Sequence, residues 1–232
     1  MGLARNDIRQ YDELAGEWWR PGGALAPLRA IAAARARLVP PASRPGAILV
    51  DVGCGGGLLA PYLDGKGYRH IGLDLVTSAL EQAAAHGVTA IRADATRLPL
   101  VDRCADVVSA GELLEHVTNW RAAVAEVSRI LRPGGLVVLD TLNNTVVSRL
   151  LAVTVAERLP GVPRGLHDPN LFVNPDVLIG EFARHGVRLE VRGVRPAFAA
   201  TVRWLVARRR EIRVVPTWST AVLYQARGRR AA

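Results

Sequence analysis

A carboxylate followed by a run of glycines is the first feature of this sequence that could do chemistry. Asp51 ends an apolar stretch and opens the bend Asp51-Val52-Gly53-Cys54-Gly55-Gly56-Gly57. Glycines such as Gly53 and Gly55 let the backbone pass close to a ligand with its amides pointing at that ligand. Asp51 would repel a pyrophosphate but would suit an ammonium group. The spacing also departs from the dinucleotide motif G-x-G-x-x-G, because Leu58 stands where the third glycine belongs.

Three more sites follow at the ends of the next predicted strands. Asp74, followed by Leu75, comes 23 residues after Asp51, and its carboxylate can bind both hydroxyls of a ribose. The pair Asp94-Ala95 can accept a hydrogen bond from an adenine amine, and Gly111 would line the floor of the pocket. Sites for an ammonium group, a ribose and an adenine, in this order, predict S-adenosylmethionine (SAM) as the cofactor.

The elements that must position these residues alternate between strand and helix. We predict strands over 47–52, 70–74, 88–93, 105–110, 136–141, 187–194 and 212–225, and helices over 7–19, 24–38, 58–66, 78–86, 120–131, 145–159 and 175–184. This alternation is typical of βαβ crossovers, so the fold class is α/β. We expect a Rossmann-like, seven-stranded, mostly parallel sheet with helices on both faces and the last two strands paired antiparallel at its edge. Ligands of such sheets bind at the carboxyl ends of the strands.

Size and composition favour one domain in the cytoplasm. The 232 residues are 50% hydrophobic, enough for one core. We divide the domain 1–232 into N-terminal helices (1–42), a SAM-binding core (43–142), an insertion or lid (143–186) and C-terminal strands (187–226). No apolar run is long enough to span a membrane, and the N-terminus lacks the apolar core of a signal peptide. The two cysteines predict neither a disulfide framework nor a zinc site.

The net charge of +9 is almost all arginine, since Lys66 is the only lysine. Genome composition and solubility explain this charge without any function. The alternative is attraction to an anionic surface through Arg203, Arg208–Arg210 and Arg213 and through the tail residues Arg227, Arg229 and Arg230. No nucleic-acid motif accompanies these clusters, so we expect a membrane surface rather than nucleic acid as the partner.

The assembled motifs resemble those of class I SAM-dependent methyltransferases, and more specifically the ubiquinone-biosynthesis O-methyltransferase family. The similarity spans roughly residues 6–225. It rests on VDVGCGGG (50–57), ELLEHV (112–117), LRPGG (131–135), the tryptophan pair Trp18-Trp19, DTLNNT (140–145), PRGLHD (163–168) and FVNP (172–175). The resemblance implies SAM contacts at Arg35, Gly53, Asp74 and Gly111, with Arg35 on the methionine carboxylate. Ala32-Ala33 replaces an Asn-Pro pair of the family shortly before that arginine, and Arg164 replaces a lysine.

Members of that family methylate a hydroxyl of a catechol-type ring, which must lose its proton because a phenol is mostly neutral at pH 7. The candidates for this step are Glu112, Glu115 and His116, whose i, i+3, i+4 spacing would place them on one helical face. All three could hold Mg²⁺ or another divalent cation with open positions for the substrate. Without a metal, His116 is the expected base, and Glu112 is the second catalytic candidate. His167-Asp168 lies in a loop that either contacts the substrate as a lid or forms an ordinary turn.

The segment 145–159 has a broad apolar face with three possible roles. It could dip into a membrane surface to collect a prenylated substrate, cover the active site, or pack into the core. The predicted function is O-methylation of a catechol- or hydroquinone-like aromatic small molecule, such as a prenylated quinone precursor, by an enzyme that is cytoplasmic or peripheral at the membrane. The alternatives are a natural-product methyltransferase acting on O, N or C of a soluble substrate, an NAD-dependent oxidoreductase, and a SAM-binding scaffold without activity. The sequence leaves the oligomeric state open.

Overall fold

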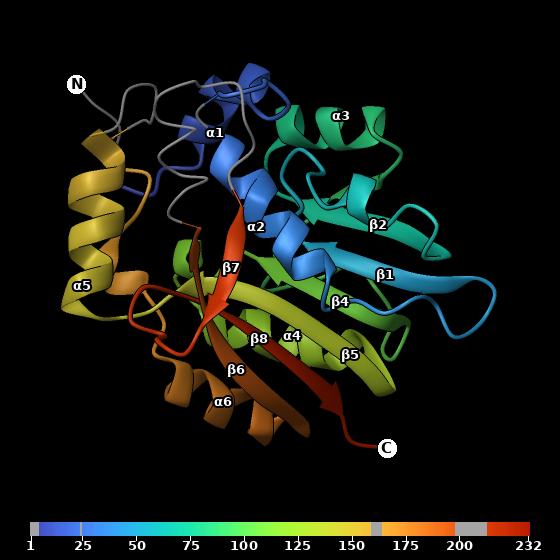
Figure 1. The fold of residues 1–232 in the computed structure, drawn as a ribbon. Coiled ribbons are helices and arrows are strands. Elements are labelled where there is room, and N and C mark those ends of the chain that lie inside the picture. The colour runs from blue at the N-terminus through green and yellow to red at the C-terminus, as the bar shows by residue number, and fades with distance from the viewer. Residues whose placement is uncertain (1–4, 24, 159–163, 198–212) are drawn as a thin grey trace.

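The computed structural model contains an eight-stranded sheet with the order β3-β2-β1-β4-β5-β8-β6-β7 (Figure 1). It describes the chain except for residues 1–4, 24, 159–163 and 198–212. The strands are β1 (Ala47–Val52), β2 (Tyr68–Asp74), β3 (Thr89–Arg92), β4 (Ala105–Gly111), β5 (Leu131–Leu142), β6 (Val187–Pro196), β7 (Val214–Thr217) and β8 (Leu223–Arg230). Strands β1 to β5 run parallel, whereas β8 is antiparallel to both β5 and β6. The predicted Rossmann-like sheet is therefore confirmed.

The prediction of seven strands was one too few. The stretch 212–225, expected as a single strand, contains β7 and the start of β8, which continues to Arg230. Between these strands the chain turns at Trp218–Val222, and the Trp218 side chain is fully exposed. The expected antiparallel pair at the edge of the sheet is formed by β6 and β7. Strand β8 does not lie at the edge, because it is inserted between β5 and β6.

Helices pack on both faces of the sheet, as expected. The longer ones are α2 (Ala26–Ala36), α3 (Thr77–Ala85), α4 (Trp120–Ile130) and α6 (Pro175–Arg184). Figure 1 shows α2 in front of the sheet and α4 behind it. Strand β1 lies between these layers, and its residues Leu49, Val50 and Val52 are almost completely buried, as is typical of a central parallel strand.

Three helix predictions were wrong in length or type. The helix expected over 58–66 is only a 3₁₀ turn at Ala60–Tyr62, where Pro61 lacks an amide donor and Gly65 adopts a φ of 73°. The helix expected over 7–19 is the short α1 (Arg9–Glu13) followed by a 3₁₀ turn at Ala15–Glu17. The segment 145–159 begins as α5 (Val146–Ser148) and continues as a π-helix over Arg149–Val155 and a 3₁₀ turn over Ala156–Arg158.

Arg229 and Arg230 of the C-terminal tail have structural partners. The Arg230 guanidinium donates to the carbonyls of Ser128, Arg129 and Leu131 at the C-terminal end of α4, at 2.6–3.2 Å. Positive charge is favourable there because it complements the helix dipole. Arg229 donates to the carbonyl of Gly134 at 2.8 Å. In the described part of the chain, no helix is long and apolar enough to cross a membrane.

Candidate cofactor and active site

The glycine bend and Asp74 lie at the carboxyl ends of β1 and β2, as the sequence predicts. Gly53, Gly55 and Gly57 have positive φ angles of 69°, 51° and 78°, which only glycine adopts without strain. The Asp74 carboxylate accepts hydrogen bonds from the amides of Gly55 and Val76, both at 2.9 Å. It therefore fixes the bend while its remaining lone pairs are available for a ribose.

The segment after β3 joins this site from the next strand. The amide of Ala93 donates to the carbonyl of Asp74 at 2.9 Å, so Asp94-Ala95 lies beside the end of β2. The Asp94 carboxylate accepts from the amide and hydroxyl of Thr96, both at 2.8 Å. Leu75 is 43% exposed next to Asp74. Contacts of Asp94, Ala95 and Leu75 with an adenosine stay predictions.

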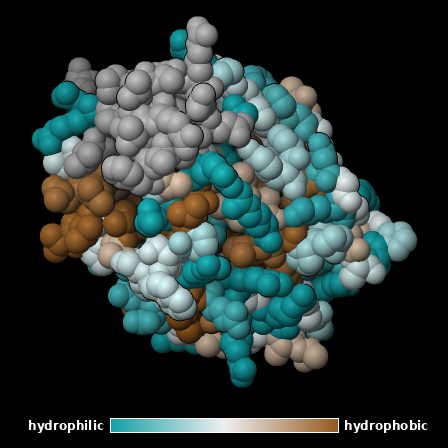
Figure 2. Space-filling view, viewed as in Figure 1, coloured by the Kyte–Doolittle hydropathy of each residue, from teal (hydrophilic) through white to brown (hydrophobic). Residues whose placement is uncertain are grey.

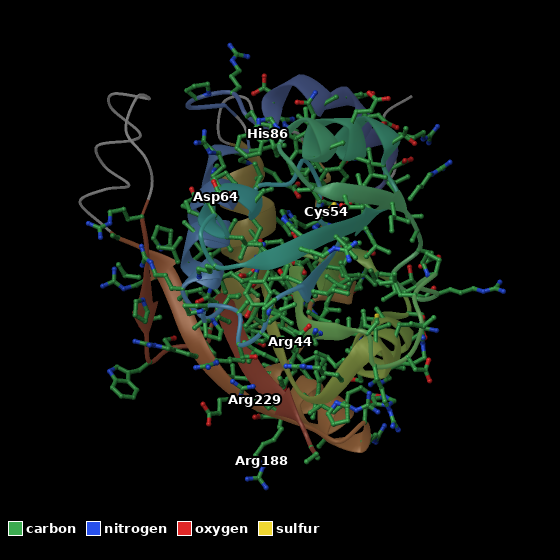
Figure 3. The ribbon with its side chains drawn as sticks, turned by 90° about the vertical axis from the view of Figure 1, so that its right-hand side faces the viewer. Arg44, Cys54, Asp64, His86, Arg188 and Arg229 are labelled. Carbon is green, nitrogen blue, oxygen red and sulfur yellow. The ribbon has the colours of Figure 1, made fainter. Side chains whose placement is uncertain are left out.

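Trp18 and Trp19 cover the glycine bend from the N-terminal segment. A Cβ atom at Gly56 would lie 2.6 Å from the Trp18 ring, and one at Gly55 would overlap the same ring. The Trp19 indole donates to the carbonyl of Gly56 at 2.9 Å and stacks on His86, with ring centroids 3.7 Å apart. The absence of a side chain at Gly55 and Gly56 thus allows the Trp18 ring to pack directly on the backbone of the bend. Figure 3 shows Cys54 and His86 on the side of the sheet where β2 and α3 lie, far from Arg188 and Arg229 on β6 and β8.

Arg35 lies directly against Gly111, beneath the cofactor pocket predicted there. Its guanidinium donates to Asp140 at 2.6 Å, and both side chains are buried, with 8% and 0% exposed. A Cβ atom at Gly111 would overlap this guanidinium. Gln225 of β8 donates to the other Asp140 oxygen at 3.3 Å. Arg35 is therefore held in place, with its Nε unpaired among the described residues.

Buried carboxylates outnumber cations around Arg35. Asp51, Glu112 and Asp140 all raise the pKa of Arg35 through their charges, although burial opposes them. Asp51 Oδ1 and Glu112 Oε1 are buried without a hydrogen-bond partner in the described part of the chain. Asp51 Oδ2 lies 3.7 Å from Nε2 of His70. Such a pocket suits a ligand that brings positive charge of its own, because unpaired buried carboxylates are costly. SAM carries both an ammonium and a sulfonium, so the residues fit this cofactor.

The predicted helical face of Glu112, Glu115 and His116 does not form. Glu112 has a left-handed φ of 49°, and only Leu114–His116 form a 3₁₀ turn. The Thr141 hydroxyl donates to Glu115 at 2.7 Å, while His116 contacts Asn6 and Tyr11. No group of three or more His, Cys, Asp or Glu side chains within the described residues is arranged to hold a metal ion. The structure therefore does not support the predicted Mg²⁺ site, because the helix that would place the three side chains on one face does not form.

Burial sets the protonation of these three residues. It raises the pKa of Glu115 to about 7, against the hydrogen bond from Thr141, which favours the carboxylate. It raises the pKa of Glu112 well above its usual range, helped by the charges of Glu115 and Asp140. Burial and the neighbouring His167 lower the pKa of His116 to about 3, so this imidazole is neutral at physiological pH.

His167 reaches the site, whereas Asp168 forms a turn. The ring centroids of His167 and His116 are 5.4 Å apart, and Nδ1 of His167 lies 3.6 Å from the Glu157 carboxylate. Asp168 instead accepts from the amide of Asn170 at 2.9 Å and caps the 3₁₀ turn Pro169–Leu171. Asp168 therefore forms the ordinary turn, which was one of the two alternatives for this pair. A contact of His167 with the substrate stays a prediction.

Four residues of the site were not among the candidates named from the sequence: Asn6, Tyr11, Asp140 and Thr141. Tyr11 lies in the stretch 7–19, which the sequence predicts as a helix. Asp140 and Thr141 end the predicted strand 136–141 at the same edge as Gly111, so the strand-end rule that found Asp74 could have found them. For Asn6 we find no signal in the sequence.

Comparison with known proteins tests the resemblance seen in the sequence motifs. Residues 50–139 match the family model described as a methyltransferase domain. The ubiquinone biosynthesis O-methyltransferase of Thiobacillus denitrificans is 37% identical over 193 residues, which cover 79% of this chain and 83% of that protein. The enzyme of the same name from Colwellia psychrerythraea is 30% identical over 208 residues, covering 81% and 85%.

A solved structure shows the same fold at low identity. It is a SAM-dependent methyltransferase of Thermotoga maritima, described as a possible histamine N-methyltransferase. Its TM-score is 0.64 at 18% identity, covering 96% of this chain and 95% of that one. The relatives confirm the resemblance seen in the motifs, and the chain belongs to the ubiquinone biosynthesis O-methyltransferase family of SAM-dependent methyltransferases.

Proposed function

We propose that this enzyme methylates a hydroxyl of a catechol- or hydroquinone-like ring that carries a prenyl tail. One observation carries the acceptor assignment: the phenolic hydroxyl of Tyr11 lies 3.3 Å from Nε2 of His116, with the two rings edge to face. A phenol of the protein itself thus occupies the space beside the candidate catalytic residues. A phenolic substrate that displaced Tyr11 would make the same contact.

The residues on the cofactor side would hold SAM, which supplies a methyl group on a sulfonium. Asp51 offers its unpaired Oδ1 to the ammonium, and Asp74 offers its carboxylate to the ribose. The unpaired Nε of Arg35 is the donor for the methionine carboxylate. The charges of Glu115, Asp140 and Arg35 all affect the pKa of Glu112, and we propose that Glu112 lies between Glu115 and the cofactor.

Glu115 is the proton acceptor in this proposal, in place of the expected His116. A general base works best when its pKa lies near the operating pH. The pKa of Glu115 is about 7 and its Oε1 has no partner among the described residues. His116, with a pKa of about 3, binds protons weakly but can accept a hydrogen bond through Nε2. We therefore assign His116 to orienting the acceptor hydroxyl and Glu115 Oε1 to taking its proton.

An exposed apolar patch near the site supports a lipid-soluble acceptor. Val146, Val147, Leu150 and Leu151 of α5 and the following π-helix are 43–82% exposed. Figure 2 shows hydrophobic side chains gathered on the side of the molecule where Figure 1 places α5. Such a face can insert into a bilayer surface, and we propose that it docks the enzyme peripherally on a membrane. The C-terminus lies on the other side in Figure 1, so the arginine tail is not part of this face. The Arg203–Arg210 cluster lies outside the described residues.

Methyl transfer from labelled SAM to a prenylated catechol and to a soluble catechol tests the proposed reaction. We expect turnover of the prenylated substrate and a loss of about 10²- to 10⁴-fold in kcat for Glu115→Gln. Glu126→Gln is the matched control, since Glu126 bonds Arg129 and the Leu98 amide away from the site. Assays with and without Mg²⁺ separate a metal effect from the effect of the carboxylate. Turnover of soluble metabolites only would favour the natural-product alternative, and full activity of Glu115→Gln would refute the assigned base.

Flotation with anionic vesicles tests the docking surface. The double variant Val146→Ser with Leu150→Ser should leave the vesicle fraction, because it removes two of the most exposed apolar side chains of the patch. Val101→Ser is the control, since Val101 is 75% exposed but belongs to a loop before β4. Equal flotation of all three proteins, or none with the wild type, contradicts the membrane proposal.

A further inference from the structure

Asn6 contacts His116 at two points, although 110 residues separate the two in the sequence. The Asn6 Nδ2 donates to the backbone carbonyl of His116 at 3.0 Å, and Nδ1 of the imidazole lies 2.6 Å from Asn6 Oδ1. The backbone amide of Asn6 donates to the carbonyl of Gly165 at 2.8 Å, which anchors the residue. Asn6 has a φ of 58°, a conformation that asparagine tolerates better than most residues.

These two contacts of Asn6 determine which ring nitrogen of His116 carries the proton. A carbonyl can only accept a hydrogen bond, so the amide NH₂ of Asn6 must face the His116 carbonyl. Oδ1 must then face the ring, and because it also only accepts, Nδ1 of the imidazole must be the donor. The neutral ring has one proton, so Nε2 is bare and accepts from the Tyr11 hydroxyl. With the proton on Nε2 instead, the ring would offer a donor where a substrate hydroxyl needs an acceptor.

We propose that Asn6 is a positioning residue that holds His116 in its Nδ1–H form, so that Nε2 orients the hydroxyl to be methylated. The inference rests on the proposed O-methyl transfer and adds a residue to it. Other groups near the His116 ring are the Tyr11 hydroxyl and the His167 ring. Neither contacts Nδ1 in the described structure, so the Nδ1–H form depends on Asn6.

The test compares two substitutions of Asn6 with one control. Asn6→Gly removes the side chain but permits the same φ and the same bond to Gly165. Asn6→Asp keeps an acceptor for Nδ1 and loses the donor to the His116 carbonyl. Arg103→Gly is the matched control, because Arg103 also has a left-handed φ, of 56°, but lies in the exposed turn before β4. The readouts are the ¹⁵N NMR signals of the His116 ring and the separate kcat and KM values for methyl transfer.

We expect the wild type, Arg103→Gly and Asn6→Asp to show a protonated Nδ1 and a bare Nε2. Asn6→Gly should populate the Nε2–H form and lose roughly tenfold or more in kcat, with KM for SAM unchanged, since a wrong tautomer in a catalytic site is costly. Asn6→Asp should recover most of kcat. An unchanged ring signal in Asn6→Gly, or an Nε2–H signal in the wild type, would overturn the inference. If the ring signals change as expected while no phenol is methylated, the positioning role stands and the proposed acceptor fails.

Discussion

Gly111→Ala should displace Arg35 and weaken SAM binding without straining the backbone. The added Cβ would overlap the guanidinium, whereas φ at position 111 is not in the left-handed region. Arg35 is buried and bonded to Asp140 at 2.6 Å, so it cannot move away from the added Cβ without disturbing that bond. The substitution therefore moves the one group expected to bind the methionine carboxylate.

The size of the effect follows from the contact that is lost. A hydrogen bond to a charged group is worth about 1.5–3 kcal/mol. Since about 1.4 kcal/mol corresponds to a tenfold change in affinity, Kd for SAM should rise roughly 10- to 150-fold. Isothermal titration calorimetry with SAM measures this directly. Gly180→Ala in α6 is the control and should leave Kd unchanged, because its added Cβ meets no atom within 4 Å.

A double-mutant cycle with Arg35→Ala decides whether the loss acts through the guanidinium. Once Arg35 is truncated, Gly111→Ala has nothing to displace, so the double variant should bind SAM no more weakly than Arg35→Ala alone. Independent, additive losses would refute the reasoning, because the alanine would then act on the pocket by another route. Circular dichroism of each variant verifies that the titrations are made on folded protein.

Three further outcomes follow from the same site. The free energy of unfolding should fall as pH rises from about 4.5 to about 7, because the folded state holds the Glu115 proton more tightly than the unfolded chain, whose carboxyl pKa is near 4.5. Urea unfolding measured across this pH range should show a smaller change for Glu115→Gln than for the wild type. Trp18→Ala should cost about 3–5 kcal/mol, as for other buried aromatic side chains, and a urea midpoint equal to the wild type would argue against its packing on the glycine bend. Asp74→Ala should abolish calorimetric SAM binding, because it frees the amides of Gly55 and Val76; retained affinity would remove Asp74 from the site.

Local sequence patterns predicted the parallel half of the fold well. The strand Ala47–Val52 was predicted with the bounds that the structure has, because a continuous apolar run between a loop and glycines suits only a strand buried on both faces. The C-terminal half was harder. The insertion of β8 between β5 and β6 pairs residues that are about 90 positions apart in sequence, such as Leu136 with Arg229. No local period encodes such a pairing.

The sequence by itself determined the class of protein and the edge of the sheet where the predicted cofactor residues lie, because Asp51, Asp74 and the glycines act through backbone geometry at strand ends. It also placed Glu115 and His116 at the site. Tertiary structure decided the protonation and the contacts of these residues. Glu115 has a pKa near 7 because the fold buries it, and His116 faces Tyr11 and Asn6 because a left-handed turn at Glu112 breaks the expected helix. Protonation and hydrogen-bond partners depend on what surrounds a side chain, and some of those neighbours, such as Asn6 and Tyr11 beside His116, come from positions more than a hundred residues away.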